Sequence, residues 1–170
     1  GLDSIIGNDV FMGDTVADRM GGEGGDDIMI GNGGTGDRYL GASGFDWAVF
    51  QHDTLAANVD MNLRAFDEAP VPLSVASSLA RFESVEGVSG SAFSDILRGD
   101  DADAAVIATS GFTGSVLTNF GLIDGLQEFV GIGVTSFGSG NIMLGGDGSD
   151  IIEGRGGDDL IDGDLSLRVR

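Results

Sequence analysis

The feature that most constrains this chain is a nine-residue spacing of aspartates within glycine-rich segments near its two ends. In the first segment, Asp9 and Asp18 are nine residues apart, Asp26 follows after eight, Asp37 after eleven and Asp46 after nine. A repeat of this length cannot bury an apolar face alone, whereas stacked copies form a continuous core. The spacing therefore predicts stacked repeats.

The clearest copies have the form GGxGxDxUx, where U is aliphatic. Residues 145–153 (GGDGSDIIE) match every defined position, residues 154–162 keep most of them, and residues 21–29 (GGEGGDDIM) are the clearest early copy. The glycines permit positive φ in a tight turn, and the residues after the aspartate form a short strand with one side chain inward. The predicted inward side chains are all apolar or aromatic: Phe11, Met20, Ile28, Tyr39, Ala48, Leu97, Met143, Ile152 and Ile161.

Several outward strand positions are apolar as well. They are Val10, Trp47, Ile96, Ile142, Ile151 and Leu160. Such a strip reflects β propensity or coverage by the segment between the repeats. Alternatively, it is a contact surface for a neighbouring domain or a second copy.

Charge limits the partners of the chain. It carries 28 acidic and eight basic residues, a formal net charge of −20, and all eight basic residues are arginine. A compact fold with this imbalance repels itself unless cations neutralise it. We therefore expect metal counter-ions, and neither nucleic acid nor an anionic membrane is a favoured partner.

The sequence offers neither a disulfide framework nor a recognisable catalytic constellation. There is no cysteine, which excludes thiolate metal ligands. The sole histidine, His52, stands beside Asp53 without a nucleophile or second histidine to complete a known arrangement. No apolar run approaches the roughly 18 residues of a membrane-spanning helix. We predict no enzymatic activity and no membrane span for this segment, which we expect to be part of a longer protein.

The repeat resembles the RTX, or haemolysin-type, calcium-binding nonapeptide. The resemblance covers roughly residues 3–49 and 138–164, with a link at residues 90–100 (GSAFSDILRGD). It implies an all-β fold in which two nonapeptides make one turn of a right-handed parallel β-roll, and calcium ions lie between loops on the same side of successive turns. The implied facing pairs are Asp9 with Asp26, Asp18 with Asp37, Asp26 with Asp46, and Asn141 with Asp159.

Carried over residue by residue, the resemblance implies a set of calcium ligands and turn residues. Calcium prefers six to eight oxygen ligands, which carboxylates and backbone carbonyls supply. The implied residues are Gly7, Asp9, Asp18, Gly21, Gly22, Glu23, Gly24, Asp26, Asp37, Gly41, Ser43, Gly44, Asp46, Asp95, Gly99, Asp100, Asn141, Gly145, Gly146, Asp147, Gly148, Asp150, Gly154, Gly156, Gly157, Asp159 and Asp164. Asn141 departs from the pattern because an amide replaces the aspartate.

We expect four segments along the chain. Residues 1–49 and 138–170 form the two β-roll blocks, residues 50–94 form a larger β-rich insert, and residues 95–137 hold a partial repeat and a linker. Within the insert, residues 59–63 alternate at the strand period. The apolar run at residues 120–130 predicts a short helix.

These observations predict a calcium-binding RTX module of a secreted, extracellular or cell-surface bacterial protein. In this interpretation the chain folds on binding several Ca²⁺ ions and stabilises its parent protein or aids its export by type I secretion. One alternative is the C-terminal region of a secreted enzyme that resembles haem peroxidases, with catalysis elsewhere. Another is a surface adhesion or matrix-binding module. Expected partners besides calcium are neighbouring domains of the parent chain or a cell-surface or matrix ligand.

Overall fold

Short parallel strands, each of three residues, form three sheets in this protein. The structure is a computed structural model that describes residues 7–66, 79–110 and 114–169. The largest sheet has the order β1 (Val10–Met12), β3 (Ile28–Ile30), β5 (Trp47–Val49), β8 (Gly87–Ser89), β10 (Ile142–Leu144) and β12 (Leu160–Asp162). The two smaller sheets are β2 (Arg19–Gly21), β4 (Arg38–Leu40) and β7 (Arg81–Glu83), and β11 (Ile151–Glu153), β9 (Ile96–Arg98) and β6 (Asn58–Asp60). An all-β fold of parallel strands is therefore confirmed.

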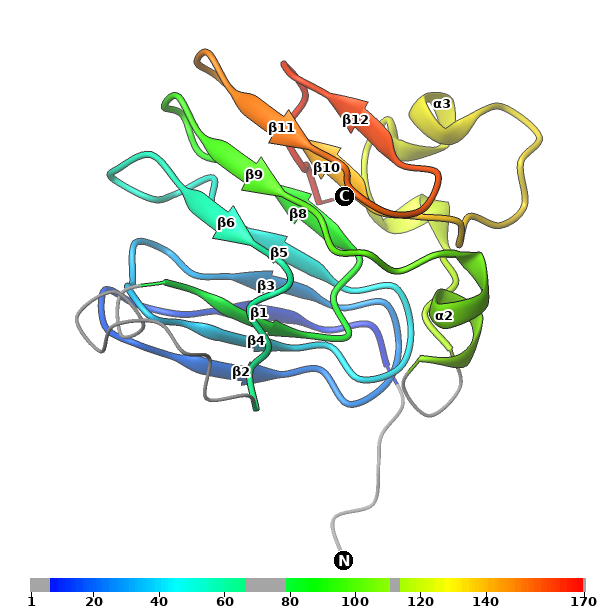
Figure 1. The fold of residues 1–170 in the computed structure, drawn as a ribbon, viewed down its shortest axis with the longest axis horizontal. Helices are drawn as coiled ribbons and strands as arrows, with labels where there is room; N and C mark the ends of the chain where they lie inside the picture. Colours follow the sequence, from blue (N-terminus) through cyan, green and yellow to red (C-terminus); the bar gives the residue numbers. More distant parts are fainter. Residues whose placement is uncertain (1–6, 67–78, 111–113, 170) are drawn as a thin grey trace, which may run out of the picture.

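The chain passes back and forth between two faces, so each of the first strands pairs with the strand two repeats away. Val10 pairs with Ile28, eighteen residues on, and Arg19 pairs with Arg38, nineteen residues on. Odd-numbered early strands thus build the large sheet, and β2 and β4 build the opposite face (Figure 1). The expected pairing of alternate repeats is present in the backbone.

The two repeat-rich ends belong to one continuous stack. Strand β8 pairs with β5 on one side and with β10 on the other, and β9 lies between β6 and β11. Strand β7 is an additional strand on the second face, where it pairs with β4 and reaches the stretch after β6 through a bridge between Arg64 and Phe82. The four sequence segments therefore contribute to shared sheets.

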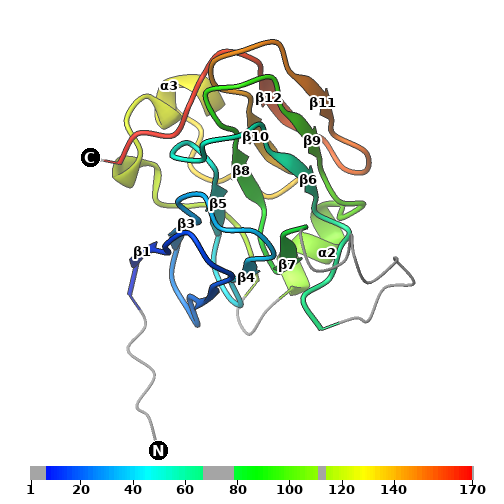
Figure 2. The same cartoon turned by 90° about the vertical axis from the view of Figure 1, so that its left-hand side faces the viewer.

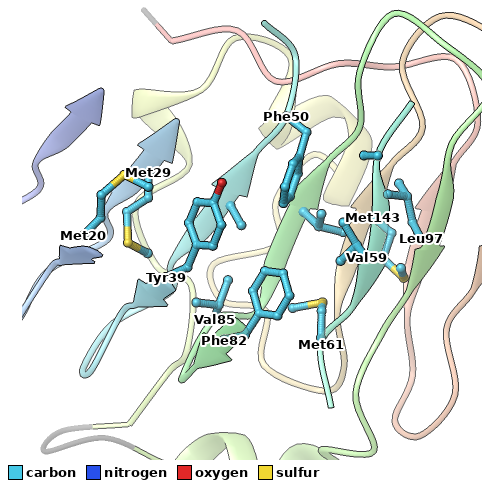
Figure 3. Close-up of a cluster of buried hydrophobic side chains, with 13 residues drawn as sticks. Met20, Met29, Tyr39, Phe50, Val59, Met61, Phe82, Val85, Leu97 and Met143 are labelled. Carbon is cyan, nitrogen blue, oxygen red and sulfur yellow. The ribbon is translucent and has the colours of Figure 1, made fainter. Parts of the chain in front are cut away.

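A hydrophobic core fills the space between the two faces (Figure 3). The middle residue of nearly every strand points into it, because alternate side chains of a strand face opposite sides. The buried cluster comprises Met20, Met29, Tyr39, Ala48, Phe50, Ala57, Val59, Met61, Phe82, Val85, Val88, Leu97 and Met143, with Phe11, Ala80 and Ile152 packed against it. The inward position in β3 is Met29, so the prediction of Ile28 was wrong by one residue. Ile161 has the same register as Met143 but is 45% exposed because it lies in the terminal strand.

A second cluster covers the outer side of the large sheet. The segment at residues 115–137, with η1 (Phe120–Leu122) and α3 (Leu126–Val130), lies there (Figure 2). Its buried members are Ile28, Ile30, Phe45, Trp47, Val49, Leu117, Phe120, Ile123, Leu126, Phe137, Ile142, Leu144 and Leu167. Gly87 makes room for the indole, since a Cβ at this position would lie 2.5 Å from the Trp47 ring. Much of the apolar strip is thus covered by this segment, whereas Val10 and Ile151 remain exposed.

The helices are short. A third, α2 (Ala104–Thr109), begins at Asp103, whose carboxylate accepts hydrogen bonds from the backbone N–H groups of Ala105 and Val106. The helix expected within residues 120–130 is present as η1 and α3. Within the described ranges, no helix has the length and apolar character needed to cross a bilayer.

Candidate metal centre

The residue immediately before each strand of the large sheet is polar, and these residues form a ladder. We call this row the first edge; it consists of Asp9, Asp27, Asp46, Glu86, Asn141 and Asp159. The backbone N–H of Asp9 donates to Asp27 Oδ1 at 2.8 Å, that of Asp27 to Asp46 Oδ1 at 2.9 Å, and that of Asp46 to Glu86 Oε2 at 3.0 Å. Asn141 N–H likewise donates to Asp159 Oδ1 at 2.8 Å. Successive turns therefore place acidic side chains one strand spacing apart.

A second edge is built the same way before the strands of the opposite face. It consists of Asp18, Asp37, Ala80, Ala57, Asp95 and Asp150. Asp18 N–H donates to Asp37 Oδ1 at 2.9 Å, and Asp95 N–H donates to Asp150 Oδ1 at 2.8 Å. Two alanines interrupt this edge, so its carboxylates stand in two separate pairs.

Two carboxylate oxygens of the first edge are buried without a hydrogen-bond partner. They are Oδ2 of Asp27 and Oδ2 of Asp46, and both residues are 0% exposed. Neither residue forms an ion pair with an arginine in the part of the chain that the structure describes. A buried, unpaired carboxylate is costly, because it loses its hydration without compensation. This pair of oxygens therefore requires protons or a cation.

Burial raises the pKa of these carboxyl groups, because it destabilises their charged form. Desolvation raises the pKa of Asp27 to about 6 and that of Glu86 to about 8. Desolvation, and then the neighbouring Glu86 carboxylate, raise the pKa of Asp46 far above its ordinary value. The buried carboxyls of the ladder therefore retain their protons to a higher pH than exposed carboxyls, unless a bound cation stabilises their charged form.

The turns that lead to the first edge have a common conformation. The second turn residue has positive φ even where it is not glycine, with 67° at Glu23, 76° at Ala42 and 70° at Arg155. Gly25 and Gly44 have φ of 121° and 115°, and a Cβ at Gly44 would lie 1.9 Å from the carbonyl oxygen of Gly25. Successive turns are therefore stacked so closely that a carbonyl of one turn lies against the backbone of the next.

The glycine that opens each turn leaves space for the aspartate that closes it. A Cβ at Gly22 would lie 2.0 Å from Asp27 Oδ2, and one at Gly41 would lie 2.2 Å from Asp46 Oδ2 and 2.0 Å from the Ser84 carbonyl oxygen. The unpartnered oxygens thus lie against the glycine that opens their own turn.

This donor set fits a hard cation such as calcium. Calcium accepts carboxylate and carbonyl oxygens in flexible geometry. Among the described residues, no three His, Asp or Glu side chains are grouped so as to hold a metal ion by themselves. An ion at the first edge would therefore be held by one or two of the carboxylates of Asp27, Asp46 and Glu86, together with turn carbonyls.

The structure corrects the register of the early repeat. Asp27, not Asp26, precedes β3 and stands between Asp9 and Asp46 in the ladder. The predicted pairs of Asp26 with Asp9 and with Asp46 were wrong. Asp26 lies one position earlier in the turn, where its Oδ1 accepts a hydrogen bond from Phe45 N–H at 2.9 Å. The doublet Asp26-Asp27 made either choice compatible with the sequence.

Two further positions change with this register. Gly21 is the last residue of β2 rather than a turn residue. Glu86 belongs to the first edge, although no glycine-rich repeat precedes it. The only sequence signal for it was an acidic residue just before the strand Gly87–Ser89. The other predicted pairs, Asp18 with Asp37 and Asn141 with Asp159, are adjacent as expected.

The remaining predicted ligands are in different surroundings. Asp95 is buried and well satisfied, because it accepts hydrogen bonds from Ala57 N–H and from the N–H and hydroxyl of Ser91. Asp100 follows β9, and its N–H donates to Asn141 Oδ1 at 3.0 Å. Asp147 and Asp164 are exposed. Their roles as ligands stay predictions.

The glycines and other turn residues of the predicted set lie where the repeat places them. Gly7 precedes β1, and the others lie in the segments between strands: Gly22, Glu23, Gly24, Gly41, Ser43, Gly44, Gly99, Gly145, Gly146, Gly148, Gly154, Gly156 and Gly157. Ser43 N–H donates to the Glu23 carbonyl at 3.3 Å, one example of the contacts between stacked turns.

Comparisons with known proteins add no relative. No family model matches the chain, and no curated protein or solved structure matches it either.

Proposed function

We propose that this chain is a calcium-binding module of the RTX type, folded as a right-handed parallel β-roll, in which the aspartates of stacked turns hold several Ca²⁺ ions. The single observation that carries the proposal is the first edge. There, two fully buried carboxylate oxygens lie without a partner among acidic neighbours. Bound calcium would supply the positive charge and the additional oxygen coordination that this edge demands.

Features of the chain support the proposal that folding depends on the cation. The ladder brings Asp9, Asp27, Asp46 and Glu86 onto successive turns, and their mutual repulsion opposes stacking. Many glycines also add conformational entropy to the unfolded chain. Without counter-ions, the core between the two faces must offset both costs alone. We therefore propose that the chain unfolds, wholly or in large part, when divalent cations are removed.

The biological setting follows from the same dependence. A module that is unfolded at low calcium and folded at high calcium suits a protein exported unfolded and active outside the cell. We propose a secreted or cell-surface bacterial parent, a structural rather than catalytic role for this segment, and export by type I secretion. His52 is exposed and lies beside Asp53, with no further group of a catalytic constellation in the sequence.

The direct test is far-ultraviolet circular dichroism of the chain in chelator and during titration with Ca²⁺. We expect strand signal and a cooperative thermal transition only with calcium, and magnesium should be much less effective because it prefers a rigid octahedral site. Equal strand content and equal Tm with and without calcium would refute the proposal.

Adjacent aspartates provide a matched pair of variants for this titration. Asp27→Asn removes a ladder carboxylate and should raise the calcium midpoint at least about tenfold, equivalent to about 1.4 kcal/mol. Asp26→Asn alters the neighbouring residue, whose carboxylate bonds Phe45 N–H instead, and should shift the midpoint much less. The reverse order would contradict the structural register.

A further inference from the structure

Three arginines stand side by side on the outer face of the sheet β2-β4-β7. Arg19 pairs directly with Arg38, and Arg38 pairs directly with Arg81. Each arginine is the first residue of its strand, and the middle residue of each strand points into the core. The arginines therefore share the outward face, and we call them the arginine stripe.

The positive charge of the stripe contrasts with the acidic composition of the rest of the chain. It holds three of the eight basic residues of a protein with a net charge of −20. Like charges at directly paired positions of neighbouring strands are destabilising. Arg19 and Arg38 are exposed, and neither makes an ion pair with a carboxylate of the described residues. Arg81 is half-buried and donates to the Arg64 carbonyl oxygen at 3.5 Å, so Arg19 and Arg38 are the exposed members of the stripe.

The neighbourhood of the stripe adds a further cation and an aromatic ring. Arg64 follows β6, lies against β7 and is paired with Glu83. Phe66 is 65% exposed, and the Arg19 guanidinium lies 5.8 Å from the centre of its ring. The surface thus combines a row of guanidinium groups with an accessible aromatic face.

We propose that the arginine stripe binds an anionic polysaccharide, one whose sulfate or carboxylate groups recur along the sugar chain. Guanidinium groups bind such oxyanions in bidentate fashion. Neighbouring strands are about 4.8 Å apart, so the three charges are anchored over about 10 Å. The exposed ring of Phe66 offers an apolar face to a sugar ring at the end of the row. The three arginines directly follow Asp18, Asp37 and Ala80 of the second edge, and none of them belongs to the first edge.

The charge spacing favours a polysaccharide over nucleic acid. Duplex DNA carries one charge per about 1.7 Å of its axis, much denser than the anchors of the stripe. A stiff duplex would also extend past the stripe onto a surface that is strongly acidic overall. A flexible chain with one charge per sugar avoids much of that repulsion.

The test measures binding of a short dextran sulfate, with uncharged dextran of equal length as a comparison, by isothermal titration calorimetry in calcium buffer. We expect the wild-type chain to bind only the sulfated form, more weakly as salt increases. The double variant Arg19→Gln/Arg38→Gln should bind at least about tenfold more weakly. The matched variant Arg98→Gln/Arg168→Gln removes two arginines outside the stripe and should bind like the wild type. Circular dichroism and the calcium titration should be unchanged in both variants.

Three results would overturn the proposal. The first is no binding of dextran sulfate at millimolar concentration. The second is equal weakening in the two double variants, which shows general charge attraction. The third is a short DNA duplex that binds as tightly as dextran sulfate and loses binding in the stripe variant, which assigns the surface to nucleic acid. Because the calcium titration is read independently, failure here is distinguishable from failure of the proposed calcium function.

Discussion

The two edges of the strand stack use the same kind of turn, yet their carboxylates are satisfied differently. On the first edge, Asp46 accepts one backbone hydrogen bond, from Asp27, and its second oxygen is buried without a partner. On the second edge, Asp95 accepts three hydrogen bonds from Ala57 and Ser91. The same residue type in the same turn position is therefore fully hydrogen-bonded on one edge and leaves a buried oxygen without a partner on the other.

The interruption of the second edge explains part of this difference. Ala80 and Ala57 stand where carboxylates would continue the ladder, which separates Asp37 from Asp95. On the first edge, Glu86 bridges the same region and keeps the row acidic from Asp9 to Glu86. A continuous row accumulates repulsion, so we expect the dependence on calcium to be concentrated there.

The largest expected effect distinguishes the edges directly. Asp46→Asn should raise the calcium midpoint by more than about tenfold, because it removes the carboxylate that lies between two neighbouring turns. In chelator the same change should be neutral or stabilising, since an amide costs less to bury than an unpaired carboxylate. Thermal unfolding in both buffers measures this.

Asp95→Asn is the matched control on the second edge. It replaces an acceptor of three hydrogen bonds by a group that is partly a donor, so it should cost about 1–3 kcal/mol. That loss should be similar in calcium and in chelator. If the two variants respond to calcium alike, the distinction between the edges is wrong.

A smaller effect concerns pH in the absence of calcium. Burial raises the pKa of Asp27 to about 6 and of Glu86 to about 8, above the values near 4 of unfolded chains. The folded form therefore holds protons that the unfolded form releases. Its added stability is complete below about pH 4 and is lost as pH rises through 6 to 8.

In chelator we accordingly expect a higher Tm, or more strand signal, at pH 5 than at pH 8. Glu86→Gln should flatten the upper part of this dependence. In calcium the dependence should weaken or reverse, because the carboxylates must be deprotonated to bind the ion. A Tm in chelator that rises from pH 5 to pH 8 is incompatible with the buried ladder.

The smallest expected effect tests the turns that lead to the first edge. Ala42 has a φ of 76°, a region that costs a residue with a Cβ about 1–2 kcal/mol. Ala42→Gly should relieve this strain and, after the entropy that glycine adds to the unfolded chain, stabilise by up to about 1 kcal/mol. Urea unfolding in calcium can resolve it.

Arg155→Gly provides the contrasting case. Arg155 has a similar φ of 70°, but its guanidinium donates to both carboxylate oxygens of Asp60. Loss of this pair should offset the relief of strain, so little or no stabilisation is expected. A larger gain at Arg155 than at Ala42 would show that backbone strain outweighs the ion pair.

The sequence predicted the parallel stack and most of its register, because glycine, aspartate and an apolar residue recur at fixed spacing. It failed at Asp26 and Ile28 for a simple physical reason. Two consecutive aspartates and three consecutive apolar residues (Ile28, Met29, Ile30) satisfy the pattern in either of two registers. Only pairing with Val10 and Trp47 selects one of them.

Other parts of the site depend on contacts that no local pattern contains. Glu86 joins the first edge through the pairing of β8 with β5, and the intervening residues carry no repeat. The saturation of Asp95 depends on Ala57, which is 38 residues away in the chain. The cover over Trp47 likewise comes from a segment with weak patterning, since apolar spacing does not reveal which face it will protect.

Trp47 provides an intrinsic fluorescence probe of folding. It is the sole tryptophan, it follows Asp46 directly, and it is 1% exposed beneath the covering segment. Its emission wavelength therefore reports how far water reaches the indole, which lies where the first edge, the large sheet and the segment at residues 115–137 meet. Stopped-flow fluorescence during calcium-induced folding can therefore show when the indole becomes buried by the segment at residues 115–137. Comparison with the strand signal shows whether the sheet forms before or after that burial.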